Sequence, residues 1–421
     1  MRVKVDSAGD YLRILSDLES QDLLTIFSEP RSGYVDVLIE PQNLAKCQDK
    51  FKSLNLTYEV ITEDVGEEVE KERRTLQLKT PVAKGDFSYD TYPSLQVMYD
   101  HLDALATKHE TKAKVLDLGE TYEKRQIRAI RMTNNIALPE SEEKPLIWID
   151  GCIHAREWVV PVTMMYFVDS LLGEQEKDKD IQMDELLDEY QIVVAPCINP
   201  DGYEYSREED RFWRKNRKPS GCKYNKANWY GGCFIKWCHG VDLNRNWDGE
   251  EFATVGISKD PCSNIYPGKE PFDQEDSRVI RDYLEPKKDK LKLFLTYHSY
   301  SQLFLFPLGY TEELPKEHEH HARVGKAVVE AIAKRHGVEY IAKPAALLYP
   351  VSGDSIDWAY TILGVIDSYT FELRPDADSW RIGFELPPEQ ILPTAQENVD
   401  GLLALIANTK YAMEKKSSDL K

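Results

Sequence analysis

The pattern of apolar and polar residues changes near residue 87. Before that point, apolar residues recur at helical spacing over residues 10–27 and 43–54. Residues 34–39 and 58–61 instead follow the pattern of strands. This succession predicts a small α+β unit at the N-terminal end.

Residues 63–74 form a connector with many charges and few apolar side chains. A segment of this kind is a linker or a solvated helix, and exposed connectors are where proteases cut. An ordinary solvated helix that is never cleaved is the alternative. Basic residues that a trypsin-like protease would recognise here are Lys71, Arg73, Arg74, Lys79 and Lys84.

Beyond residue 87, apolar strands alternate with helical segments. Near-continuous apolar strands between helices predict an α/β fold, with a mixed, mostly parallel sheet sandwiched by helices. Ligand sites in such sheets lie beyond the carboxyl ends of the strands. We expect strands at 145–149, 191–195, 291–296 and 369–373, and helices at 94–108, 160–172 and 319–336.

Composition narrows the possible partners. Hydrophobic residues make up 42% of the 421 residues and charged residues 30%, which favours a globular protein over disorder. The net charge of -20 disfavours nucleic acid, because phosphate binding needs clustered Lys and Arg. No stretch approaches the ~20 apolar residues that cross a bilayer, so we expect no membrane partner.

Seven cysteines bear on the cellular compartment. Four of them fall within residues 222–262, and no C-x-x-C pair occurs, which argues against a zinc ribbon or a redox motif. Disulfides in an oxidising compartment fit better. Met1 is followed by charged residues rather than by an apolar leader, so a cytosolic protein with reduced thiols stays open.

Three candidate metal ligands follow predicted strands. His154 and Glu157 come after the strand at 145–149, and His298 ends the strand at 291–296. Imidazole and carboxylate are natural zinc donors. Taken singly, H-x-x-E is a weak signal and a lone His is more often a packing residue. A shared metal requires the His298 donor to lie within about 5 Å of the other two.

Four further polar residues carry candidate chemistry. Glu372 lies inside an apolar strand, where a carboxylate is costly unless it is paired or used. It could deprotonate a metal-bound water, or it could pair with a nearby arginine. Arg214, Asn244 and Arg245 could bind an anionic substrate end and stabilise an oxyanion. For either arginine alone, a surface salt bridge is the alternative.

Taken together, the motifs resemble one family over the whole chain. HAREW (154–158), RFWRKNR (211–217), VDLNRNWD (241–248), HSYSQL (298–303), SIDWAY (355–360) and TFELR (370–374) are similar, in order, to the zinc metallocarboxypeptidases of the pancreatic digestive (carboxypeptidase A/B) type. The first ~85 residues resemble the family's inhibitory pro-segment. The resemblance implies a ferredoxin-like pro-domain at 1–74, a connector to about residue 86 and a catalytic domain at 87–415.

The family's activity then carries over residue by residue. The resemblance implies a secreted zymogen, activated by a trypsin-like protease, that hydrolyses the C-terminal bond of peptides and proteins with a free C-terminus. One zinc ion per chain would be held by the matches His154, Glu157 and His298, with water in the fourth position. Glu372 would be the general base, Arg214 would steady the oxyanion, and Asn244 and Arg245 would bind the terminal carboxylate.

Preference for the final residue depends on its pocket. Ile356 stands where the basic-specific branch carries an aspartate, which implies aliphatic and aromatic C-terminal residues (A-type). Asp354 replaces a usual glycine, so release of Lys or Arg (B-type) stays open if its carboxylate reaches the pocket. The resemblance also makes Tyr349 a mobile cover, and Arg156 and Tyr300 contacts for upstream residues. Further pocket residues, all apolar or small, are Leu305, Gly309, Leu348, Val351 and Thr370.

The resemblance pairs Cys238 with Cys262, and Cys222 with Cys233 is an additional candidate disulfide. Cys152 and Cys197 either pair or stay reduced, and Cys47 is left over. A silent, peptide-binding relative is the remaining alternative in function. It would be expected to lack a zinc ligand or the base, whereas this chain has all of them.

Overall fold

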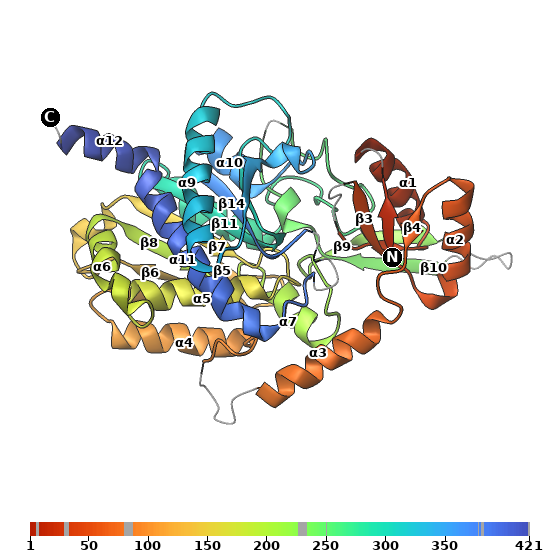
Figure 1. Ribbon diagram of the computed structural model, residues 1–421, viewed down its shortest axis with the longest axis horizontal. Helices are drawn as coiled ribbons and strands as arrows, with labels where there is room; N and C mark the ends of the chain where they lie inside the picture. The colour runs from red at the N-terminus through yellow and green to blue at the C-terminus, as the bar shows by residue number, and fades with distance from the viewer. Residues whose placement is uncertain are drawn as a thin grey trace.

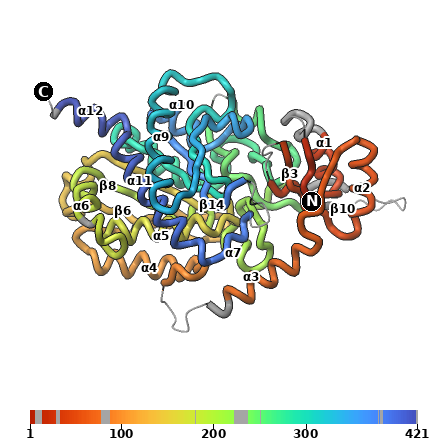
Figure 2. Tube along the Cα trace, in the orientation of Figure 1, coloured from red at the N-terminus to blue at the C-terminus, as the bar shows by residue number. Residues whose placement is uncertain are grey.

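The computed structural model describes residues 1–5, 8–28, 33–79, 87–225, 234–249, 251–377, 379 and 383–419. Figure 1 shows a large sheet domain with a small N-terminal unit beside it, joined by one long helix. The tube in Figure 2 follows the same path and ends at α12 (Lys410–Asp419), far from the small unit.

An eight-stranded mixed sheet forms the centre of the large domain. Its order is β13-β12-β14-β11-β7-β8-β6-β5. The pairs β12–β13, β14–β11, β11–β7 and β7–β8 are parallel, and the other three are antiparallel, which confirms a mixed, mostly parallel sheet. The strands are β5 (Ala113–Glu120), β6 (Gln126–Met132), β7 (Leu146–Gly151), β8 (Gln191–Ala195), β11 (Leu291–Ser301), β12 (Leu303–Phe306), β13 (Ile341–Pro344) and β14 (Ser368–Asp376).

Helices cover both faces of this sheet, which explains the continuous apolar strands. On β7, Ile147 and Ile149 face one core while Leu146 and Trp148 face the other. The first core packs against α4 (Leu95–Lys108), α5 (Val159–Leu171), α6 (Asp180–Glu189), α7 (Pro200–Glu208), α9 (His318–His336) and α11 (Ile391–Asn408). The second packs against α8 (Glu275–Leu284) and α10 (Ser355–Thr361).

The small unit has ferredoxin-like topology. Its four strands have the order β2-β3-β1-β4, and its helices α1 (Ala8–Ser20) and α2 (Leu44–Ser53) give a β-α-β-β-α-β succession. The predicted helix over 10–27 is wrong beyond Ser20. Asp22 has a φ of 55°, which a right-handed helix cannot accommodate, and a short strand follows. The strands are β1 (Arg2–Lys4), β2 (Thr25–Ile26), β3 (Tyr34–Leu38) and β4 (Tyr58–Glu59).

The charged connector is a helix, α3 (Val65–Lys79), that contacts the large domain. Glu72 on α3 accepts hydrogen bonds from Arg211 Nε at 2.6 Å and Nη2 at 3.1 Å. This ion pair is nearly buried, with side-chain exposures of 11% and 2%. The connector is therefore docked through at least one specific contact rather than loosely tethered.

Three of the cysteine expectations can be compared with the structure. Cys238, on the hairpin β9 (Pro219–Asn225) and β10 (Phe234–His239), is bonded to Cys262, as expected. Cys152 and Cys197 are both buried free thiols, as is Cys47. The candidate bridge from Cys222 lies outside the described side chains, since Cys233 is not among the described residues.

Among the described residues, no helix is long and apolar enough to span a bilayer.

Candidate metal centre and cleft

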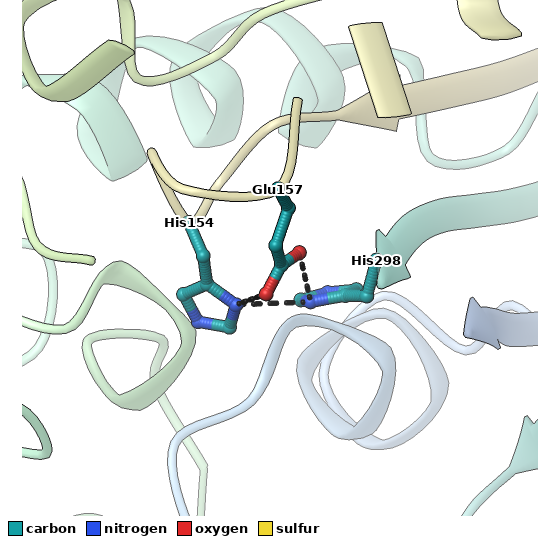
Figure 3. Close-up of side chains that lie close together, drawn as sticks. All are labelled: His154, Glu157 and His298. Carbon is teal, nitrogen blue, oxygen red and sulfur yellow. Dashed lines mark hydrogen bonds and ion pairs between the residues drawn. The ribbon is translucent and has the colours of Figure 1, made fainter. Parts of the chain in front are cut away.

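Three side chains from two strand ends meet with their donor atoms together (Figure 3). His154 and Glu157 lie in the turn between β7 and α5, and His298 lies on β11. His154 Nδ1 is 2.9 Å from Glu157 Oε1 and 3.1 Å from His298 Nδ1. His298 Nδ1 is 3.5 Å from Glu157 Oε2. All three donor–donor distances are well below the ~5 Å limit for ligands that share one ion.

The spacing of these donors fits a zinc ion. Bonds of about 2.0–2.1 Å in tetrahedral geometry would hold donor atoms about 3.3 Å apart, and the observed range is 2.9–3.5 Å. Two imidazoles and one carboxylate also match a site that keeps its fourth position open. All three residues are at most 3% exposed, so the donors lie in a largely buried site.

Asp242 orients the first of these ligands from behind. Its Oδ1 lies 3.1 Å from His154 Nε2, so an Nε2–H can donate to it, which leaves Nδ1 with its lone pair toward the metal position. Asp242 Oδ2 accepts from Arg214 Nε at 3.0 Å and Nη2 at 2.9 Å. Sequence reasoning assigned Asp242 no role, although the VDLNRNWD motif contains it, because only the fold brings it to His154.

Charge holds this cluster ionised. Burial acts to raise the pKa of Glu157, but His154, His298 and Arg214 lower it below its ordinary value. Burial likewise opposes ionisation of Asp242, but Arg214, Arg245 and His154 keep the pKa of that carboxyl well below its usual range. Both carboxylates are therefore anionic at neutral pH and favour a bound cation.

Glu372 reaches the same cleft from the neighbouring strand. β11 and β14 are parallel, and their register places His298 directly opposite Glu372. The nearby Arg374 is bound to Glu397 instead, with its Nε 2.8 Å from Glu397 Oε1. Arg374, the nearest arginine along the strand, is therefore not the partner of Glu372.

A cationic group lies in the same cleft as the three donors. Arg245, in the turn η4 (Leu243–Arg245), is 1% exposed, and its Nη1 lies 3.8 Å from Asp242 Oδ2. Its Nε donates to Gly256 O at 2.9 Å, which fixes the guanidinium. The Tyr349 ring lies 5.9 Å from the Arg245 guanidinium carbon. Asn244 Oδ1 accepts from Ser355 N at 3.1 Å.

All the predicted ligand, catalytic and substrate-binding residues except Tyr300 and the pocket candidate Gly309 line one cleft. Tyr300 is 1% exposed and packs its ring edge-on against Phe384, 5.1 Å between centroids, so it lies behind the lining. Ser28, Ser299, Ala345 and Phe384, which the sequence did not single out, also line the cleft. The lining comprises Ser28, His154, Arg156, Glu157, Arg214, Asn244, Arg245, His298, Ser299, Leu305, Ala345, Leu348, Tyr349, Val351, Asp354, Ile356, Thr370, Glu372 and Phe384.

Fold and cleft together define a metal-binding α/β protein with a carboxylate and arginines beside the metal position. The family described as zinc carboxypeptidase matches residues 98–401, and the carboxypeptidase activation peptide matches residues 1–72. The chain belongs to the zinc carboxypeptidase family and carries its activation peptide. It is therefore a metallopeptidase of the carboxypeptidase A/B kind in pro-form.

Individual relatives from both specificity branches are similar to the chain. It is 32% identical over 409 residues to mouse carboxypeptidase A4, which covers 96% of this chain and 91% of the relative. It is 37% identical over 322 residues to carboxypeptidase B of Astacus astacus, covering 76% and 96%. The solved carboxypeptidase A of Helicoverpa armigera matches with a TM-score of 0.81 and 25% identity, covering 97% and 96%.

Proposed function

We propose that the chain is a secreted zymogen whose catalytic domain, residues 87–415, releases single C-terminal residues from peptides and proteins. The observation that supports this most is the meeting of three donors from His154, Glu157 and His298, with Glu372 in the same cleft. Residues 1–74 act as the pro-segment and the connector runs to about residue 86. An activating protease with trypsin-like preference cuts this connector.

His154, Glu157 and His298 hold the one zinc ion, which when bound would polarise a water molecule and the scissile carbonyl. Glu372 is the general base: it takes a proton from the attacking water and delivers it to the leaving amine. Arg214 donates to the oxyanion of the tetrahedral intermediate. Asp242 keeps Arg214 in place through two hydrogen bonds to its Oδ2.

Arg245 and Asn244 explain why the enzyme would act only at a chain end. A guanidinium binds a carboxylate through parallel hydrogen bonds, and an internal peptide offers no carboxylate there. Arg245 is almost fully buried, and its Nε and Nη1 donate to Gly256 O and Asn244 O, so its position in the cleft is fixed. Tyr349, which is only partly buried beside Arg245, covers the bound residue.

The walls of the pocket favour apolar C-terminal residues. Leu305, Leu348, Val351 and Ile356 line the cleft together with Thr370. Burying a Leu or Phe side chain against such walls contributes about 1.5–3 kcal/mol. We therefore propose that aliphatic and aromatic C-terminal residues are accepted, as in the A-type branch.

The pro-segment keeps the intact chain inactive by occupying the upstream part of the cleft. Ser28 lines the cleft, and the Phe27 ring packs edge-on against Phe384 at 5.5 Å. The Arg156 guanidinium carbon lies 5.5 Å from the Phe27 ring centroid and 4.2 Å from that of Phe384. A substrate residue upstream of the scissile bond would need this space, so the pro-segment must leave first.

The test is a panel of blocked dipeptides ending in Phe, Leu, Lys, Arg or Glu. The full chain is assayed before and after trypsin, with and without a chelator. We expect turnover only after trypsin, loss with the chelator and recovery with zinc. Glu372→Gln should lower turnover by about 10²–10⁴-fold without zinc loss, because it removes the base. The exposed Glu313→Gln is the control.

Two results would contradict this proposal in different ways. Substantial turnover by Glu372→Gln would eliminate Glu372 as the base. Full activity of the uncleaved chain would show that residues 1–74 do not inhibit.

A further inference from the structure

One acidic side chain lines the otherwise apolar part of the cleft. Asp354 is 4% exposed and borders the same cleft as Val351 and Ile356. Its Oδ1 accepts a hydrogen bond from Asp357 N at 2.8 Å, which caps α10. Its Oδ2 points toward Gly309: a Cβ on Gly309 would lie 2.2 Å from that oxygen. Only one of the two oxygens is therefore used by the cap.

A second buried carboxyl also lies close to Gly309. Asp357 is 6% exposed, and its Oδ2 accepts from Gly309 N at 2.8 Å and Tyr310 N at 3.2 Å. A Cβ on Gly309 would lie 3.3 Å from this oxygen as well. Any side chain at position 309 would therefore displace Asp354, and both carboxyl groups approach the same side of this glycine.

The ionisable groups facing this pair are few. The charge of Arg245 on η4 acts on Asp354, and the charge of Asp354 acts on Asp357. Beyond Asp357 lies Tyr360, which donates to Glu317 at 2.5 Å. Burial raises the pKa of Asp354 to about 6, against hydrogen bonds from Asp357 and Ile356 and the charge of Arg245. Burial and the neighbouring Asp354 raise the pKa of Asp357 well above its usual value.

We propose that Asp354 is a specificity-determining residue whose carboxylate receives the cationic head of a C-terminal Lys or Arg. The same pocket then takes apolar residues and basic residues, and the protonation of the carboxyl pair sets the balance between them. This rests on the proposed function, since it assigns the residue that the peptidase releases.

The chemistry of the pocket suits such a residue. A buried carboxylate with one oxygen outside the cap is costly to ionise unless a cation accompanies it. Lys and Arg carry a long apolar stem that can lie along Leu348 and Val351 while the head reaches Asp354 Oδ2. When Asp354 holds a proton, the lining is neutral and an apolar residue is bound without leaving a charge unpaired.

The experiment compares two blocked dipeptides, one ending in Lys and one in Leu, from pH 5 to 7.5. The full chain is activated with trypsin, which is then blocked with a serine-protease inhibitor. The measured quantity is the ratio of kcat/KM for Lys to that for Leu. Ionisation of the catalytic groups changes kcat/KM by the same factor for both substrates. The ratio therefore reports only on the pocket that binds the C-terminal side chain.

In the wild type the ratio should rise about tenfold over this range, since Asp354 with a pKa of about 6 is mostly protonated at pH 5 and mostly ionised at pH 7.5. Asp354→Asn keeps a good helix cap but loses the charge. We expect this variant to lose at least tenfold in kcat/KM for Lys at pH 7.5, to release Leu at pH 7.5 at least as well as the wild type because the pocket is now neutral, and to show a flat ratio. Asp354→Ser, which also retains a cap, should behave like Asp354→Asn.

The outcomes separate this inference from the proposed function. If neither dipeptide is hydrolysed by the activated wild type, the carboxypeptidase assignment itself fails. If Leu is released but the ratio has the same pH profile in the wild type and in Asp354→Asn, Asp354 is only a helix cap and the inference is overturned. Activity on Leu also reports that each variant is folded.

Discussion

Asp242 offers the sharpest prediction, because one buried carboxylate serves two functions. Its Oδ1 accepts from His154 Nε2 at 3.1 Å and from Asn244 N at 3.0 Å. Its Oδ2 accepts the two bonds from Arg214. In Asp242→Asn, the amide oxygen can keep the first pair of contacts. The amide NH₂ then faces the donors of Arg214, which are left without their anion.

The expected magnitude follows from the burial of this pair. Arg214 is 3% exposed, and Asp242 is fully buried. Breaking a buried ion pair by removing one charge typically costs about 3–5 kcal/mol. Loss of a carboxylate behind a metal-binding histidine typically weakens metal binding by about 10–100-fold. We therefore expect Asp242→Asn to lower both the free energy of unfolding and the affinity for zinc.

Two assays measure these effects separately. Competition with a chromophoric chelator gives the zinc affinity, and urea unfolding of zinc-loaded and zinc-stripped chains gives the stability. Asp282→Asn is the matched control, since Asp282 pairs with Arg281 at the surface with a side chain 59% exposed. The reasoning is refuted if Asp242→Asn keeps zinc affinity within twofold of the wild type and loses under 1 kcal/mol of stability.

Two further predictions concern buried acids. Burial raises the pKa of Asp276 from 3.8 to about 7. Between about pH 4 and 7 the native state therefore keeps a proton that the unfolded state loses, and the free energy of unfolding falls as the pH rises through this range. Asp276→Asn, which can still accept from Asn216, should therefore gain up to about 4 kcal/mol in unfolding free energy at pH 8 and little at pH 4, measured by urea titration. Glu72→Gln should raise the activity of the uncleaved chain several-fold by weakening the contact with Arg211, whereas Glu70→Gln, on the exposed side of the same helix, should not. Unchanged stability at pH 8, or unchanged basal activity, would contradict the respective argument.

The central strands of the fold could be predicted from the sequence, and its edges could not. Residues 191–195 match β8 at both ends, because a strand buried on both faces is a continuous apolar run. β5 and β6 were not predicted, since β5 is half exposed and its pattern is irregular. The helix predicted over 10–27 was too long because Leu23 and Leu24 continue the apolar periodicity through the turn at Asp22.

The candidate site was predictable as a set of residues but not as a geometry. His154, Glu157 and His298 stand out because ionisable residues follow apolar strands. That His298 lies opposite Glu372 depends on the strand order β14-β11-β7, which no local pattern encodes. Asp242 and Ser28 gave no signal, because their importance comes from neighbours more than 80 residues away along the chain.

Arg245 acts on two buried aspartates, Asp242 and Asp354, whose pKa values are shifted in opposite directions. Asp242 faces three cationic or protonatable groups, Arg214, Arg245 and His154, and these outweigh the cost of burial. Among the charged groups that act on Asp354, only Arg245 lowers its pKa. Burial, which raises this pKa, therefore outweighs the effect of Arg245. The first carboxylate is therefore a fixed charge that orients His154 and Arg214, and the second can titrate. Arg245 also donates to Gly256 O and Asn244 O, so its position does not depend on Asp354 alone. Neutralising Asp354 should therefore alter which C-terminal residue is released without weakening the binding of the substrate's terminal carboxylate.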